Sequence, residues 1–106
     1  MLGRLINFWR GHERRQHVRI TSLSLIVHVD KKRFETVDWS LGGFWITGFR
    51  GHAHKGTTLS GTIKHPDAAV GEFVAEVVAA DGGDVRARFM EITPAVFVAM
   101  GGLRQL

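Results

Sequence analysis

Residues 72–92 read EFVAEVVAADGGDVRARFMEI, and this stretch decides the fold because two apolar-rich runs flank a turn within it. Asp81-Gly82-Gly83-Asp84 is the turn, since glycine readily adopts the positive φ angles that a tight hairpin needs. The runs on either side, Glu72–Ala80 and Val85–Ile92, are therefore predicted to be two antiparallel strands. This hairpin is one part of a strand pattern that extends through most of the chain.

Four more strands are predicted upstream of the hairpin. Thr21–Asp30 alternates apolar and polar positions, which is typical of a half-buried strand. Its inward face is predicted to carry Leu23, Leu25, Val27 and Val29. The other three strands are predicted at Arg33–Val37, Phe44–Thr47 and Thr57–Lys64.

A helix is predicted at each end of the chain. Thr93 and Pro94 are typical of a helix start, because Thr is a good N-cap and proline lacks only an N–H that the first turn does not use. Val96, Met100 and Leu103 share one face of this C-terminal helix. Leu2, Leu5, Ile6 and Trp9 also fall at helical spacing, so Leu2–Arg10 is predicted to be a short amphipathic helix.

Together these elements predict a mainly β protein, a six-stranded antiparallel β-barrel with a C-terminal α-helix. Residues 1–12 are predicted to form an N-terminal arm, flexible or short-helical, and residues 13–106 a single domain. The chain has 106 residues and no cysteine, which excludes disulfides and thiolate metal sites and suits a cytoplasmic protein. No apolar run approaches the roughly 20 residues that span a bilayer.

Positive charge is concentrated in the first third of the chain. Residues 1–33 contain eight Lys/Arg and two Asp/Glu, a net charge of +6, and residues 34–106 contain six and eight, a net charge of −2. This asymmetry favours a local anion site over a general affinity for polyanions. A solvated arm that binds nothing would show the same charge pattern.

Two short motifs stand in the half of the chain before the hairpin. Arg15-Gln16-His17-Val18-Arg19 is an RxxxR element, and Asp38-Trp39-Ser40-Leu41-Gly42-Gly43 is a DxSxxG element. Each alone is weak evidence, since arginines often decorate surfaces and the second motif also fits a side-chain-closed hairpin turn. In this order, and ahead of this strand pattern, the pair resembles the signature of the PilZ domain, a bacterial receptor module for cyclic di-GMP.

The resemblance covers about ninety residues, from Glu13 to the C-terminal end. The sequence departs from the family pattern in two places. The gap between the motifs, Ile20 to Val37, has eighteen residues and is slightly short for the family, and Ala87 stands where many members have glycine. The resemblance implies a PilZ-type barrel that binds cyclic di-GMP and changes conformation to regulate a downstream protein partner. It implies ligand contacts from Arg15 and Arg19, and from Asp38, Ser40 and Gly43 on the barrel surface.

The chemistry of these residues suits a bis-guanine dinucleotide. Arginine forks to phosphate oxygens or to the O6 and N7 edge of guanine and also stacks on bases. A carboxylate accepts from the N1–H and N2–H₂ donors on the other edge of guanine, and glycine allows close backbone approach. Arg14, just before the RxxxR, resembles the arginine of members that bind two stacked nucleotides per chain. An arginine-rich lead-in is also expected to order on ligand, residues 11–20 closing on the barrel.

Other functions are weighed against this one. A barrel that does not bind nucleotide and serves as a protein–protein interaction module is one alternative, and the intact motifs argue against it. A small RNA- or DNA-binding barrel is another, but no aromatic and basic stripe runs along a sheet face. No nucleic acid polymer, membrane association, cofactor or catalytic activity is expected. His52, His54 and His65 lack the carboxylates or cysteines of a metal site, so no metal is expected either.

Overall fold

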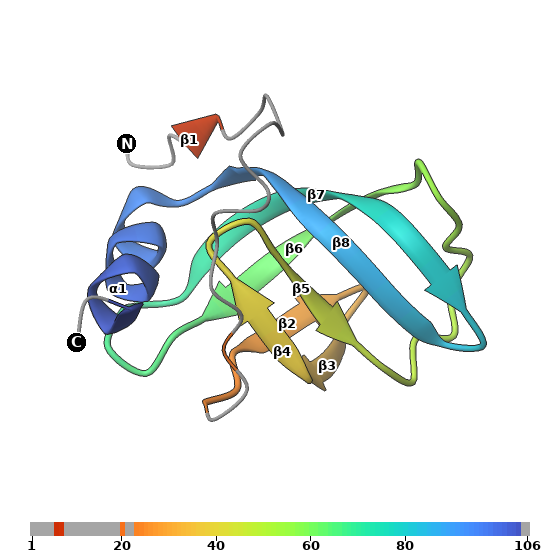
Figure 1. The fold of residues 1–106 in the computed structure, drawn as a ribbon, viewed down its shortest axis with the longest axis horizontal. Coiled ribbons are helices and arrows are strands. Elements are labelled where there is room, and N and C mark those ends of the chain that lie inside the picture. Colours follow the sequence, from red (N-terminus) through yellow and green to blue (C-terminus); the bar gives the residue numbers. More distant parts are fainter. Residues whose placement is uncertain (1–5, 8–19, 21–22, 105–106) are drawn as a thin grey trace.

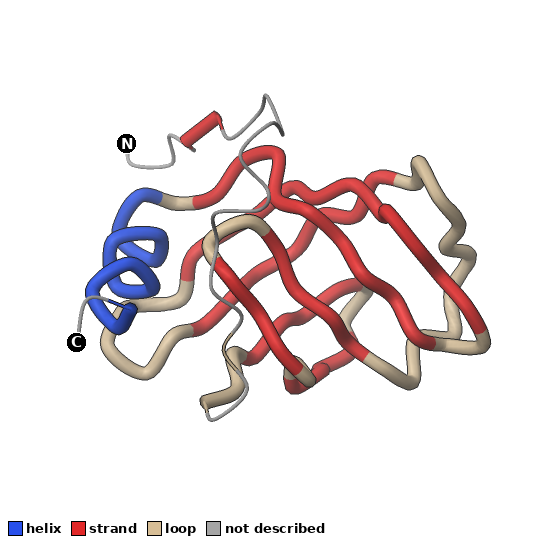
Figure 2. The backbone as a smooth tube through the Cα atoms, viewed as in Figure 1, coloured by secondary structure: helices blue, strands red, loops and turns tan. Residues whose placement is uncertain are grey.

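The residues described in the computed structural model of the chain are 6–7, 20 and 23–104, with side chains described at residue 20 and over 23–101. Figure 2 shows that this part is mainly strand, with a helix at one end. The elements in chain order are β1 (Ile6–Asn7), β2 (Ile26–Val29), β3 (Lys32–Glu35), β4 (Asp38–Ser40), β5 (Gly43–Ile46), β6 (Thr58–Lys64), β7 (Gly71–Asp81), β8 (Asp84–Ile92) and α1 (Pro94–Arg104).

The strands form one curled antiparallel sheet, a half-barrel, with the pairing order β3-β2-β6-β7-β8-β5-β4 (Figure 1). The long β7–β8 hairpin lies at its centre, and Gly82 and Gly83 in its turn have the positive φ angles that the sequence indicated. Register shifts interrupt this hairpin between Val74 and Ala75 and between Val77 and Ala79. Bulges of this kind bend a strand and increase its twist, which helps a sheet to curl.

Two consecutive residues, Thr36 and Val37, join the two edges of the curled sheet. Thr36 donates its backbone N–H to the carbonyl of Leu25, 3.0 Å away, beside β2. The next residue, Val37, donates to the carbonyl of Trp45 in β5 at 2.7 Å. The Thr36 hydroxyl also accepts from the backbone N–H of Leu25 at 2.9 Å. Two residues therefore connect the edge that begins with β3 to the edge that begins with β4.

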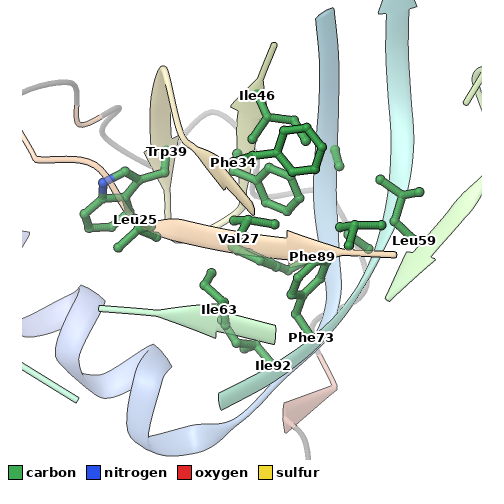
Figure 3. Packing of buried hydrophobic residues seen from close by; sticks show 14 of the residues in the cluster. Leu25, Val27, Phe34, Trp39, Ile46, Leu59, Ile63, Phe73, Phe89 and Ile92 are labelled. Carbon is green, nitrogen blue, oxygen red and sulfur yellow. The ribbon is translucent and has the colours of Figure 1, made fainter. Parts of the chain in front are cut away.

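The concave side of the sheet holds an apolar core that is rich in aromatic rings. Phe44, Phe73 and Phe89 come from β5, β7 and β8, and their ring centroids lie 5.4 to 6.2 Å apart in tilted or edge-to-face pairs. Such pairs add about 0.5–1.5 kcal/mol each to the free energy of burial. Figure 3 shows side chains from several strands converging on this interior, with Trp39 at one side near Leu25. Of the four residues predicted to face inward, Leu25, Val27 and Val29 are buried and Leu23 is half-buried. The strand predicted over Thr21–Asp30 is shorter in the structure, where β2 is Ile26–Val29 and residues 23–25 are outside it.

Helix α1 packs at the end of the half-barrel where β7 begins (Figure 1). Val96 and Met100 are fully buried, as their helical spacing predicted, and the side chain of Leu103 lies outside the described set. A methyl group on Gly71 would lie 2.6 Å from the Val96 side chain, so the helix needs a glycine beneath it. Thr93 occupies the predicted start, but its hydroxyl binds the backbone of Glu72 at the beginning of β7.

Two further predictions about the elements are wrong. The barrel was predicted to have six strands, and the pairing order has seven, because Asp38–Ser40, assigned to a turn motif, pairs as β4 with β5. The predicted helix over Leu2–Arg10 is wrong at Ile6–Asn7, which pairs as β1 with Ile92 and Glu91 of β8. Isolated helices shorter than about 12 residues are marginal in water, and pairing satisfies backbone groups at the β8 edge. The rest of that stretch lies outside the described residues.

Candidate functional site

The DxSxxG motif forms the β4–β5 hairpin. Asp38 pairs with Trp45, Trp39 with Phe44 and Ser40 with Gly43, leaving Leu41 and Gly42 as a two-residue turn. The Ser40 hydroxyl accepts from the backbone N–H of Gly42 at 3.1 Å, and the Ser40 side chain is buried. The serine thus closes its own turn, and its side chain is buried instead of lying on the barrel surface as expected.

Gly43 lies very close to the backbone of β8. A methyl group there would lie 2.0 Å from the carbonyl oxygen of Ala87 and 2.9 Å from the Cα of Arg88. Both are backbone atoms of β8, so neither can move without shifting the strand. Gly43 was expected to allow the close approach of a ligand. In the structure, it allows the close approach of β5 and β8.

The chain that follows the RxxxR motif lies directly beside the DxSxxG motif. Ile20 and Trp39 form an antiparallel bridge in which Ile20 donates to Trp39 at 2.6 Å and Trp39 donates to Ile20 at 3.0 Å. The Trp39 indole N–H also donates to the carbonyl of Leu23 at 2.7 Å. Arg14, Arg15 and Arg19 lie outside the described residues, but Arg19 is covalently bonded to one member of this bridge.

The hairpin and the neighbouring strand β8 carry a row of polar and aromatic side chains on the outer face of the sheet. Asp38 of β4 is opposite Trp45 of β5, and Trp45 is opposite Arg86 of β8. Their inward-facing neighbours Trp39, Phe44 and Ala87 are buried, whereas Asp38 and Trp45 are half-buried and Arg86 is exposed. The Arg86 guanidinium carbon lies 4.0 Å above the centre of the Trp45 ring, which is a cation–π contact.

A second arginine on the same face of β8 has a different partner. Arg88 is paired with Glu76 of β7, and its Nε and Nη2 groups donate to Glu76 Oε1 at 3.1 and 2.6 Å. Nothing in the sequence marks Arg86 or Arg88 as a site residue, because each occupies an ordinary polar position of an alternating strand. Only the strand pairing shows that Arg86 is two strands from Asp38.

Behind the hairpin, Trp39 contacts a buried histidine. The rings of Trp39 and His65 meet edge-to-face with centroids 6.2 Å apart, and His65 is 1% exposed. His65 Nδ1 accepts from the backbone N–H of Asp67 at 3.0 Å. Burial lowers the pKa of His65; the Asp67 carboxylate opposes this effect and the Lys64 ammonium adds to it. The histidine is thus a neutral part of the packing beneath the candidate site.

The three histidines considered for a metal site are in different surroundings. His52 and His54 are exposed in the loop between β5 and β6, whereas His65 is buried. Over the described ranges, no group of three or more His, Cys, Asp or Glu side chains is arranged to hold a metal ion. Within the same part of the chain, no helix is both long and apolar enough to cross a bilayer.

Comparison with known proteins adds no family assignment. No family model matches the chain, and a search of curated proteins finds no significant match.

Proposed function

We propose that this chain is a receptor for cyclic di-GMP with a PilZ-type barrel, and that the nucleotide binds on the outer face of the β4–β5 hairpin. The observation that supports the proposal best is the bridge between Ile20 and Trp39. It joins the residue after the RxxxR motif to the residue between Asp38 and Ser40. The covalent chain therefore keeps the arginines within reach of the DxSxxG hairpin.

Each motif residue has a role in this proposal. Arg15 and Arg19 bind phosphate and guanine edges, and Asp38 accepts from the N1–H and N2–H₂ donors of guanine. Asp38 is half-buried on the outward side of β4, which suits a reader of base edges. Ser40 and Gly43 act mainly by shaping the hairpin, since the serine hydroxyl closes the turn and the glycine admits β8.

In this proposal, nucleotide binding changes the surface of the protein, and a downstream protein recognises the changed surface. Residues 11–20 close over the nucleotide. The Ile20–Trp39 bridge transmits this closure to β4 and to the hydrogen bond between the Trp39 indole and the Leu23 carbonyl. Arg14 provides the additional positive charge that a second, stacked nucleotide requires. Amide exchange of residues 1–20 with and without nucleotide tests the closure, and identical exchange in both states contradicts it.

Calorimetry with cyclic di-GMP tests the binding itself. Arg15→Ala, Arg19→Ala and Asp38→Asn are each expected to weaken binding at least about tenfold, equivalent to about 1.4 kcal/mol. Arg33→Ala is the matched control, because Arg33 is exposed on β3 and pairs with Glu35 at 3.3 Å. It should bind like the wild type.

The same titration addresses ligand choice and stoichiometry. The wild type should bind cyclic di-GMP in preference to GMP or GTP at physiological salt, and at saturation it should hold two nucleotides per chain. A polyanion site would instead weaken steeply with salt and discriminate little between nucleotides. Absence of cyclic di-GMP binding by the folded wild type rejects the proposed function, and saturation at one nucleotide rejects only the stacked pair.

A further inference from the structure

Arg86 is a second arginine site that the motifs do not include. Its guanidinium lies 4.0 Å over the Trp45 ring, and the two residues are directly paired across β8 and β5. One face of the guanidinium is covered by the indole. Because Arg86 is an exposed residue, the other face can receive a planar group from solvent.

The position of this stack relates it to the proposed nucleotide site. Asp38 is the partner of Trp45 on the other side of β5. Neighbouring strands are about 4.8 Å apart, so Asp38 and Arg86 are separated by about 10 Å of sheet surface. The carboxylate and the cation–π pair are therefore close enough to contact the same dinucleotide.

A guanidinium held flat is well suited to stacking on a base. Arginine stacks on nucleobases through its planar face, and a pre-organised side chain loses little conformational freedom when the ligand binds. Trp45 supplies the pre-organisation here. Its indole nitrogen is buried and has no hydrogen-bond partner among the described residues, so packing and the contact with Arg86 hold the ring in place.

Arg88 shows by contrast why Arg86 is the candidate. Both arginines lie on the outer face of β8, but two donors of Arg88 are engaged by Glu76. That pairing aligns the Arg88 guanidinium with a carboxylate on β7, on the side of β8 away from Trp45. Among the described residues, Arg86 has an aromatic support and no acidic partner.

We propose that Arg86, supported by Trp45, is the stacking platform for one guanine of the bound nucleotide, with Asp38 reading the edge of a base beside it. This inference rests on the proposed function and adds to it a contact from β8. Stacking is tolerant of base identity, whereas a carboxylate at the guanine edge is not. Affinity should therefore depend on Arg86, and the choice of guanine over adenine on Asp38.

The test is calorimetry with cyclic di-GMP and cyclic di-AMP on the wild type and five variants. Arg86→Ala, Arg86→Lys and Trp45→Leu are expected to weaken cyclic di-GMP binding about tenfold, the scale of one base–side-chain stack. Lysine keeps the charge but lacks the planar face, so it separates stacking from electrostatics. Arg88→Ala removes the same charge from the same strand and should change affinity less than about twofold, within the scatter of surface substitutions.

Specificity supplies the second readout. Arg86→Ala should retain the wild-type preference for cyclic di-GMP over cyclic di-AMP, while Asp38→Asn should lose it. If the wild type binds and Arg86→Ala binds equally well, or if Arg86→Lys is unimpaired, the stacking platform is rejected and the proposed function stands. If the folded wild type binds neither nucleotide, both the function and the platform are rejected.

Discussion

A methyl group on Gly43 would lie 2.0 Å from the carbonyl oxygen of Ala87, a distance at which backbone must move. We expect Gly43→Ala to lower the free energy of unfolding by about 1–3 kcal/mol, as for other overpacked sites. Urea denaturation measures this change.

Gly101→Ala is the matched control for Gly43→Ala. Nothing lies within 4 Å of a methyl group at Gly101, which is inside α1. Alanine there should raise the free energy of unfolding by about 0.5–1 kcal/mol, because it restricts the unfolded chain and favours helix. Equal stabilities of Gly43→Ala and the wild type would show that the close approach is not needed for the fold.

His65 makes stability depend on pH. Burial lowers its pKa below the ordinary value of about 6.5, so folding favours the neutral ring. Its contribution is then complete above pH about 6.5 and is lost as pH falls below that value toward the folded-state pKa. One such proton changes the free energy of unfolding by at most about 1.4 kcal/mol per pH unit.

Unfolding in urea at a series of pH values tests this dependence. His65→Asn places an amide oxygen near the position of Nδ1, where it can accept from the Asp67 N–H, but it does not titrate. The variant should show a shallower loss of stability between pH 7 and pH 5 than the wild type. His54→Asn, at an exposed loop position, should keep the wild-type slope. Parallel pH profiles for His65→Asn and the wild type would contradict the assignment.

At the scale of elements, alternation was a good guide wherever a strand was long. The β7–β8 hairpin, β6 and the inward face around β2 were predicted because one side of each is buried. The two short strands were missed for a physical reason. β4 has three residues and β1 has two, which is too few for a periodic pattern, and their pairing depends on neighbours distant in the chain.

The two-residue connection between β3 and β4 carries a further prediction. Thr36→Val would remove the acceptor of the Leu25 N–H, which lies in a buried bond of 2.9 Å. An unsatisfied buried donor costs about 1–3 kcal/mol, so the free energy of unfolding should fall by that amount. Thr47→Val, at an exposed position just after β5, should change it by less than about 0.5 kcal/mol. Denaturant unfolding of both variants measures the difference, and equal values would reject this role for Thr36.

At the scale of the whole molecule, the proposed ligand should stabilise the fold. A nucleotide that binds only the folded chain adds about 2.7 kcal/mol at a concentration one hundred times its Kd. For a domain of this size that is a rise in Tm of about 10 °C or more. Cyclic di-GMP should give this shift in a thermal melt, while GMP with the wild type should give little. At the same concentration, cyclic di-GMP with Asp38→Asn should give at most about half of the shift, because the affinity is at least about tenfold weaker. Equal shifts with GMP and cyclic di-GMP would point to general anion binding.

The sequence by itself determined the fold class, the strands of the central hairpin, the C-terminal helix and the two motifs, because alternation, turn glycines and motif spacing are local properties. The tertiary structure alone decided which distant residues become neighbours. It placed Ile20 beside Trp39, brought Gly43 against β8 and set Asp38, Trp45 and Arg86 in one row. Strand register creates that row, and register is fixed by burial and hydrogen bonding over the whole sheet rather than by any one segment.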